Sequence, residues 1–287
     1  MKFDFIAAEN AHKTYDVKFM CRMLEVSRSG FYAHTPGGIT QRQRDDLALV
    51  PLLHAEHKQY PRGCGSRTLV GALRASGKRV GRRRVKRLMS QEKLTCRLKR
   101  RYVTTTQSKH DHRVAPNLLA RSFAPAAPNR TWAGDITYLH TKQGWAYLAA
   151  LLDVGTRKVV GWAVGPTMDA ELVLTALDRA LEERSPPPGL IHHSDRGVQY
   201  ASHVYQAALA ERGIECSMSR KGNCWDNAVV ESFFSSLKRE LPNDQPFEDA
   251  RDAERAVFAY VEAHYNTHRR HSALGYLSPN EYERRAA

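Results

Sequence analysis

The sequence predicts a helical region with strong positive charge, followed by a mixed α/β unit in which helices flank a five-stranded sheet. Two observations divide the chain in this way. Between residues 61 and 109 there are sixteen Lys or Arg residues and a single acid, Glu92, so the whole positive excess of the +14 chain lies in this segment. From residue 131 onward, short stretches rich in β-branched and aromatic residues alternate with helical patterns.

General properties of the sequence limit the class of protein. A chain of 287 residues is long enough for two or three domains with buried cores. It has no run of eighteen apolar residues, and residues 1–13 lack the basic-then-apolar pattern of a secretion signal, so we expect a cytoplasmic protein without membrane partners. Its five cysteines are odd in number and show no C-x-x-C spacing, which is typical of reduced packing residues.

The first predicted element is a pair of short helices within residues 15–34. Ser27 is placed to cap the second of them, because a serine hydroxyl accepts a hydrogen bond from a free amide in the first turn. This pair fits either a helix-turn-helix or a small packing hairpin, and the stretch alone does not separate the two. A Gly/Pro linker follows at 35–38, and then a helix over 43–58, in which Pro51 predicts a kink or a later start.

The positively charged segment contains a second pair of predicted helices. Ser66 is expected to cap a helix over 67–75, Gly77 to end it, and the second helix to run over 82–91. Two short helices with a tight Gly-containing link are typical of helix-turn-helix units, whose second helix enters the major groove of DNA. We therefore expect phosphate contacts from this helix, with a merely solvated basic helix as the alternative. The cationic residues concerned are Arg82, Arg83, Arg84, Lys86 and Arg87.

A polar and then Pro/Ala-rich stretch, 104–130, predicts a linker to the α/β unit. After it, three consecutive strands are expected to pair antiparallel, with a hairpin turn at 153–157. Helices and two short strands then alternate and complete the mixed unit. The strands are expected at 131–140, 144–154, 158–164, 189–195 and 214–219, and the helices at 169–184, 203–213, 221–241 and 247–265.

Three acidic residues occupy unusual places in this pattern. Asp135 lies inside the first strand among apolar residues, Asp195 ends a strand, and Glu231 lies in the middle of the helix predicted over 221–241. Each alone has an ordinary explanation, as an edge residue, a turn cap or a solvated helix acid. If they converge, their mutual repulsion requires a cation, and carboxylate oxygens select Mg²⁺ or Mn²⁺. Two such ions can clamp the attacking and leaving oxygens of a phosphoryl displacement, and the basic segment would bind the matching substrate, a polyanion such as DNA.

The chain also contains motifs that are long enough to compare with a known family. These are WAGDITY at 132–138, HSDRGVQY at 193–200, DNAVVESFFSSLK at 226–238, YNTHRRHSALGYLSP at 265–279, VSRSGFY at 26–32 and RVKRLM at 84–89. With them, the chain resembles the DDE transposases of bacterial insertion sequences, of the OrfB type, which have a retroviral-integrase-like catalytic core. The family spacing is matched as well, because 35 residues separate Asp195 from Glu231 and Lys238 follows the glutamate by seven positions.

The resemblance implies a ribonuclease-H-like fold in which Asp135, Asp195 and Glu231 bind two Mg²⁺ (or Mn²⁺) ions. It implies water activation for strand cleavage at transposon ends, and then strand transfer, in which the 3′-hydroxyl attacks a second phosphodiester. Lys238 would contact DNA near the scissile bond. A ribonuclease-H-like nuclease without strand transfer and a DNA-binding regulator with a vestigial site are the alternatives.

The residues and the resemblance together predict a domain order and partners. The expected partners are double-stranded DNA from element ends and target, further copies of the chain on that DNA, and an upstream-frame helix-turn-helix protein, separate or as a frameshift fusion. Within the cytoplasm we expect association with the nucleoid. The predicted parts are an N-terminal helical segment (1–38), a basic DNA-binding domain (40–105), a linker (106–130), an integrase-type core (131–241), and a C-terminal helix and tail (242–287).

Overall fold

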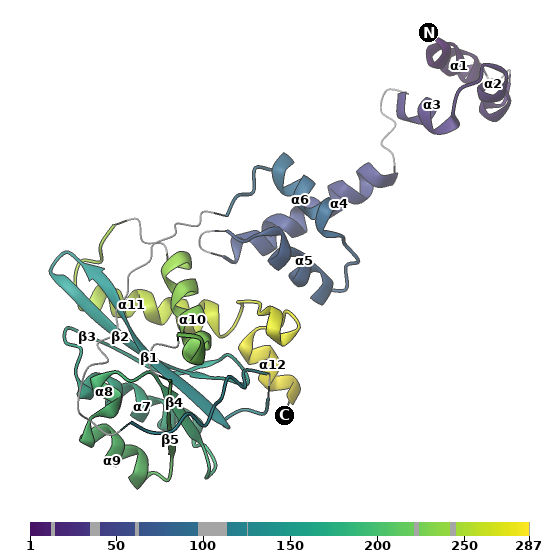
Figure 1. Cartoon of the computed structure of the whole chain (residues 1–287). Coiled ribbons are helices and arrows are strands. Elements are labelled where there is room, and N and C mark those ends of the chain that lie inside the picture. The colour runs from purple at the N-terminus through teal and green to yellow at the C-terminus, as the bar shows by residue number, and fades with distance from the viewer. Residues whose placement is uncertain are drawn as a thin grey trace. The chain divides into compact units, whose positions relative to one another are not determined.

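The computed structural model describes residues 1–12, 15–34, 41–60, 63–96, 114–124, 126–220, 224–241 and 245–286. Within the predicted linker, residues 106–113 and 125 therefore lie outside the described residues. The chain divides into two compact units, Met1–Ala55 and Glu56–Ala287, and helix α4 (Gln41–Lys58) contains the boundary between them (Figure 1). Across the described residues, no helix combines the length and apolar character needed to cross a membrane.

The N-terminal unit begins with three short helices, α1 (Lys2–Ala11), α2 (Val17–Met23) and α3 (Arg28–His34). Their small apolar cluster includes Ile6, Met20 and Phe31. The predicted cap of the second helix is confirmed, because the Ser27 hydroxyl accepts a 3.0 Å hydrogen bond from the Gly30 amide. Helix α4 begins at Gln41 and continues through Pro51, so the expected later start is wrong.

The basic segment forms α5 (Ser66–Ala75) and α6 (Arg82–Gln91), as the sequence predicts. Their apolar residues pack together, with Leu69, Leu73, Val85 and Leu88 buried. Helix α5 starts one residue earlier than expected, with Gly65 rather than Ser66 at the N-cap position and no capping side chain. Gly77 ends it as predicted, with φ +77°, a backbone conformation that glycine adopts without strain.

The second unit is built on a five-stranded mixed sheet, which confirms the predicted fold class. Strand β1 lies at its centre, antiparallel to β2 and parallel to β4. Strand β3 extends the β2 side antiparallel, and β5 extends the β4 side in parallel. The strands are β1 (Thr131–Thr141), β2 (Gly144–Asp153), β3 (Val159–Gly165), β4 (Ile191–Ser194) and β5 (Glu215–Met218).

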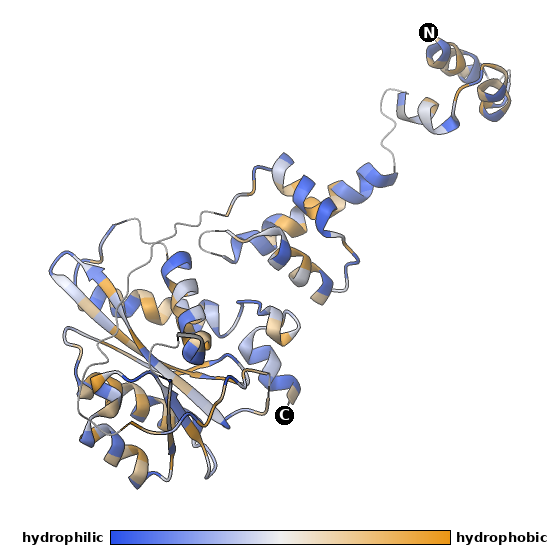
Figure 2. Ribbon diagram, in the orientation of Figure 1, coloured by the Kyte–Doolittle hydropathy of each residue, from blue (hydrophilic) through white to orange (hydrophobic). Residues whose placement is uncertain are grey.

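Helices cover both faces of this sheet and make three layers (Figure 1). On one face, α7 (Ala170–Arg184), the short α8 (Val198–Ala201) and α9 (His203–Glu211) bury Leu177 and Tyr205 against Trp132 and Leu151. On the other face lie α10 (Ala228–Glu240), α11 (Ala250–Phe258) and a π-helical turn, Ala259–Tyr265. The flanking helices carry both hydrophobic and hydrophilic residues along their length (Figure 2). A 3₁₀ turn, Ser272–Leu274, and α12 (Pro279–Ala286) follow.

The alternating direction of side chains along the strands explains the two apolar layers. Successive side chains of β1 and β2 point to opposite faces of the sheet. Ala133 and Leu148 accordingly belong to the layer under α10 and α11, whereas Trp132 and Ala149 belong to the layer under α7 and α9. The helices are therefore fixed on the sheet from both sides, and the ends of β1 and β4 are held in one place.

Candidate active site

Asp135 and Asp195 are brought together by the register of two parallel strands. In the pairing of β1 with β4, Gly134 lies opposite Ser194. The next residue on each strand is an aspartate, so the two aspartates follow side by side where β4 ends. Strand β1 continues past this point, and the Ile136 amide donates a 2.8 Å hydrogen bond to Oδ1 of Asp135. The structure thus places at one sheet position two residues that are sixty positions apart in sequence.

The loop after β4 holds the Asp195 carboxylate in place. The Gly197 amide donates a 2.8 Å hydrogen bond to Oδ1 of Asp195. A Cβ atom added at Gly197 would lie 2.9 Å from that same oxygen, so the glycine allows the loop to approach the carboxylate closely. Next to it, Arg196 donates to the Ser219 carbonyl oxygen at 2.7 Å and ties the loop to the end of β5.

Glu231 comes from the helix that covers the same end of β1. It lies in the first turn of α10, so its expected position in the middle of a helix is wrong. The helix is shorter than predicted because the chain forms a 3₁₀ turn, Cys224–Asn227, before α10 begins. The first turn suits a carboxylate, since the free amides of a helix N-terminus stabilise negative charge. The apolar residues Val230, Phe233 and Leu237 are buried against the sheet, as the sequence predicts.

The charges of these residues interact. Burial raises the pKa of Asp135 well above its usual value, and repulsion from Asp195 and, less strongly, from Glu231 raises it further, while the Ile136 hydrogen bond and the Lys238 charge oppose the rise. Burial and repulsion from Asp195 also raise the pKa of Glu231. For Lys238, partial burial lowers the pKa and the Asp135 carboxylate opposes that change. The three carboxylates and this ammonium group therefore form one electrostatic site.

The donor set fits a divalent cation. Carboxylates are the hard oxygen ligands that Mg²⁺ and Mn²⁺ prefer, and a cation would offset the repulsion that raises the pKa of Asp135 and of Glu231. In the part of the chain that the structure describes, no three His, Cys, Asp or Glu side chains already stand close enough together to hold a metal ion. The acids are thus neighbours whose side chains would have to close further around a cation.

Two histidines next to Asp195 have structural roles. His192 is fully buried and shares a 3.0 Å hydrogen bond with the Tyr205 hydroxyl. His193 is hydrogen-bonded to the hydroxyls of Ser217 and Ser219 at 2.8 and 3.2 Å. Burial lowers the pKa of His192 to about 3 and that of His193 to about 4, so both rings are neutral near pH 7. They support β4 and carry no charge into the site.

Two residues at the end of the 3₁₀ turn hold the start of α10 in place, although the sequence assigned neither of them a role. The Asp226 side chain is fully buried and accepts hydrogen bonds from Arg220, Arg121 and Asn117 at 2.8 to 3.0 Å. The hydrogen bonds from Arg220 hold the pKa of Asp226 well below its usual range. Asn227 donates to the Gly134 carbonyl oxygen at 3.3 Å. The signal in the sequence was that both residues begin the DNAVVESFFSSLK motif, just before Glu231.

The predicted DNA-contacting cations lie on α6. Arg82, Arg83 and Lys86 are exposed, while Arg84 and Arg87 are half-buried. Arg83, Lys86 and Arg87 line a shallow hollow together with Ser90 and Gln91. Val85 and Leu88 of the same helix are buried, so the apolar side of α6 holds it in the fold and its cationic side remains accessible.

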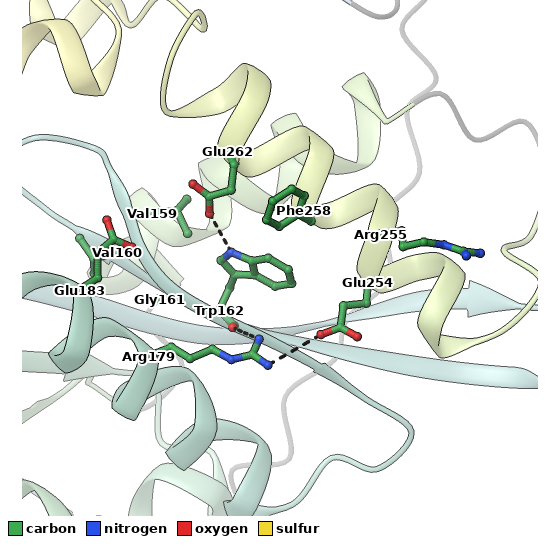
Figure 3. Close-up of a pocket in the computed structure, with 10 residues that line it drawn as sticks. All are labelled: Val159, Val160, Gly161, Trp162, Arg179, Glu183, Glu254, Arg255, Phe258 and Glu262. Atoms are coloured by element: carbon green, nitrogen blue, oxygen red, sulfur yellow. Dashed lines mark hydrogen bonds and ion pairs between the residues drawn. The ribbon is translucent and has the colours of Figure 1, made fainter.

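A larger hollow, of about 540 Å³, lies apart from the acids, against the edge strand β3 (Figure 3). Several of its polar groups pair across the hollow (Figure 3). Trp162 donates its ring N–H to Glu262 at 3.1 Å, and Arg179 donates to the Trp162 carbonyl oxygen at 3.0 Å. The Arg179 guanidinium, on α7, also lies 3.8 Å from the carboxylate of Glu254, on α11. No carboxylate of the β1–β4 site lines it, so the two features are separate.

Comparisons with known proteins agree along the chain. Two family models, each described as an integrase core domain, match residues 125–224 and 212–279, and a model of an HTH-like domain matches residues 43–102. An uncharacterized 31 kDa protein of insertion element IS600 from Shigella sonnei is 43% identical over 260 residues, which are 91% of this chain and 96% of that protein. The transposase InsF of insertion sequence IS3A from Escherichia coli (strain K12) is 39% identical over 289 residues, covering 99% of this chain and 98% of the relative.

Among solved structures, the catalytic core domain of HTLV-2 integrase in complex with magnesium, in its trimeric form, matches with a TM-score of 0.43 and 16% sequence identity. The match covers 55% of this chain and 99% of that one.

Proposed function

Since the chain belongs to the family of insertion-sequence transposases with an integrase core domain, we propose that it is a DDE-type DNA transposase that cuts DNA at the ends of its element and joins them to target DNA. One observation carries the assignment to specific residues. The β1–β4 register sets Asp135 beside Asp195, and α10 brings Glu231 into electrostatic contact with both.

These three carboxylates are the proposed ligands of two Mg²⁺ or Mn²⁺ ions. When bound, such ions polarise the scissile phosphodiester and stabilise the charge that develops on the attacking and leaving oxygens. The Ile136 amide donates a hydrogen bond to Oδ1 of Asp135 and the Gly197 amide donates one to Oδ1 of Asp195, so the backbone helps to orient both carboxylates. Lys238 is partly buried and interacts electrostatically with Asp135, which supports a role for its ammonium group in binding a DNA phosphate beside the acids.

The proposed reaction has two displacements at phosphorus. In the first, water attacks a phosphodiester at the element end, the P–O3′ bond breaks, and the departing oxygen takes up a proton as a free 3′-hydroxyl. In the second, this hydroxyl attacks a target phosphodiester, loses its proton and forms a new P–O bond as the old one breaks. Both steps need the same clamp on two oxygens of one phosphate, which is why one site of three carboxylates suffices.

DNA binding is assigned to α6 within the predicted basic domain, 40–105. Support comes from the HTH-like match over 43–102 and from the exposed Arg82, Arg83 and Lys86, while Arg84 and Arg87 stand beside them. These cations would contact phosphates and place the DNA without reading its sequence. The linker, 106–130, would connect this domain to the core, 131–241, which the C-terminal segment, 242–287, completes.

We also propose that several copies act together on DNA, because an insertion requires both element ends to be joined at one target. An upstream-frame helix-turn-helix protein, separate or fused by frameshifting, would complete end recognition, and the N-terminal segment, 1–38, is the part closest to such a fusion. Binding to chromosomal DNA would keep the protein in the nucleoid.

The direct test is incubation of the protein with labelled ends of its element, target DNA and Mg²⁺, with nicking and joining scored separately. Asp135→Asn, Asp195→Asn and Glu231→Gln should each abolish both products while DNA binding, measured by fluorescence anisotropy, survives. Asp178→Asn is the matched control, because this half-buried aspartate lies on α7, away from the acids, and pairs only with Arg212, at 2.9 Å, among the ion pairs that the structure describes.

The outcomes separate the candidate functions. Nicking without joining would indicate a nuclease, and binding without nicking would indicate a regulator with a vestigial site. Near-normal nicking by any one of the three acid variants would contradict the assignment of that residue.

A further inference from the structure

We infer that Asn227 is a positioning residue of the acidic site: its amide group ties α10 to β1, and its carbonyl oxygen receives a hydrogen bond from an ordered water molecule when the site is loaded with a divalent ion. This role rests on the proposed function, because it concerns the way in which Glu231 meets the two aspartates. It goes beyond that function, since Asn227 is neither a carboxylate ligand nor a DNA contact.

The first observation is a helix cap that is not made. Asn227 occupies the N-cap position of α10, where asparagine normally accepts a hydrogen bond from an amide of the first turn. Its side chain makes no such bond. Instead, Nδ2 reaches across to the Gly134 carbonyl oxygen in β1, at 3.3 Å. A cap is worth about 1 kcal/mol, so the contact with β1 replaces a local interaction that the helix would otherwise gain.

The second observation is a buried oxygen without a partner. Asn227 is only 3% exposed, and its Oδ1 has no hydrogen-bond partner within the protein. Leaving a buried acceptor unpaired costs about 1 to 3 kcal/mol. Rotating the amide by half a turn would not help, because Oδ1 would then face the Gly134 carbonyl oxygen. The unpaired acceptor therefore points to a donor that the protein itself does not supply.

The position of Asn227 in the fold relates its unpaired oxygen to the three acids. Gly134 is the residue before Asp135, and it pairs with Ser194, the residue before Asp195. Glu231 lies four positions after Asn227, one helical turn further along the same face of α10. The Asn227 side chain thus contacts β1 directly beside Asp135, and Glu231 follows it by one helical turn. A water molecule that hydrates a cation held by these acids would supply this donor.

The chain offers a matched comparison in Asn266, which is 2% exposed. Its Oδ1 accepts a hydrogen bond from the Val159 amide and its Nδ2 donates to the Val159 carbonyl oxygen, both at 3.0 Å. This asparagine joins the C-terminal segment to β3, and both of its polar groups are paired. It represents a purely structural buried asparagine in the same unit.

The experiment compares wild type with Asn227→Ala, Asn227→Leu and Asn266→Ala. Leucine keeps nearly the volume of asparagine without its polar atoms, so it separates loss of hydrogen bonds from loss of packing. The first readout is the rise in melting temperature of the DNA-free protein during titration with MgCl₂ or MnCl₂, which gives a half-saturating ion concentration. The second is the Mg²⁺ dependence of nicking at labelled element ends.

Both Asn227 variants should raise the half-saturating ion concentration about 10-fold or more in the two assays, as loss of a group that orients metal ligands does elsewhere. Asn266→Ala should lower the melting temperature and leave the half-saturating concentration unchanged. The inference is overturned if either Asn227 variant folds with wild-type ion dependence, or if both fail to fold, which would make the residue structural only. A wild-type protein that neither responds to ions nor nicks DNA would instead contradict the proposed function.

Discussion

Glu240, at the C-terminal end of α10, provides a quantitative test of how this helix is held. Its carboxylate accepts hydrogen bonds from Arg269 at 3.0 and 3.1 Å and from the Tyr260 hydroxyl at 2.8 Å, and His264 lies 3.7 Å away. Burial alone would raise the pKa of Glu240. The contact with His264 and the charge of Arg269 outweigh burial and lower the pKa to about 2. We therefore choose Glu240→Gln, which removes the charge and keeps the shape.

The magnitude follows from the pKa shift. A fall from 4.5 to about 2 corresponds to about 3 kcal/mol of stabilisation of the folded state. The amide keeps part of the hydrogen bonding but leaves the buried Arg269 without its counter-charge, so we expect a loss of about 2 to 3 kcal/mol near pH 7. Because the folded-state pKa lies below the unfolded one, the stabilisation is complete above the unfolded pKa of about 4.5 and declines as the pH falls toward 2.

Urea denaturation followed by tryptophan fluorescence, at about pH 7, 5 and 3, measures this difference. The gap between wild type and Glu240→Gln should be large at the two higher values and clearly smaller at the lowest. Glu254→Gln is the control, because that residue is 40% exposed and lies 3.8 Å from Arg179, a geometry worth less than about 1 kcal/mol. An equal gap at all three pH values, or none at pH 7, would refute the reasoning.

Two further predictions concern the aspartate loop and the basic helix. Gly197→Ala should leave the melting temperature nearly unchanged but slow nicking by about 10- to 100-fold. The reason is that the added Cβ would lie 2.9 Å from Oδ1 of Asp195 and displace that oxygen. Unchanged nicking rates would show that the loop tolerates the shift. Arg83→Ala and Lys86→Ala should each reduce the slope of log affinity against log salt concentration by about 0.9, as measured by fluorescence anisotropy on duplex DNA. An unaltered slope would show that the substituted residue does not contact a phosphate.

Much of the fold could be predicted because its signals are local. All five strands and helices α5, α6, α7 and α9 appear close to their expected bounds. Gly77, for example, ends α5 because glycine readily adopts the left-handed backbone conformation found there. The two aspartates stood out for the same kind of reason, since an acid inside or directly after a buried strand needs an explanation. That the two aspartates are adjacent, however, depends on the pairing of β4 with β1, which is a long-range contact that local sequence patterns do not predict.

The details around Glu231 could not be predicted, because long-range contacts decide them. The periodic pattern from 221 to 241 favours one continuous helix, yet the chain turns at Cys224–Asn227 and α10 starts at Ala228. The turn is held by Asp226, whose partners include Arg121, more than one hundred positions earlier in the chain. The Ser66 cap failed similarly, since Gly65 occupies the cap position without any side chain. Local patterns set where helices can form, and tertiary partners set where they end.

The polar face of α10 shows why neither level suffices alone. A helix with a glutamate and a lysine on one side is most often a solvated surface helix. Here hydrogen bonds hold the helix at both ends, from Asn227 to the Gly134 carbonyl oxygen at its start and from Arg269 to Glu240 at its end. Glu231 and Lys238 lie between these two fastenings, and both interact electrostatically with strand aspartates. A helix fixed at both ends cannot slide or turn to relieve the repulsion between its glutamate and the aspartates. The repulsion is therefore retained by the fold, and a divalent cation is the species that would relieve it.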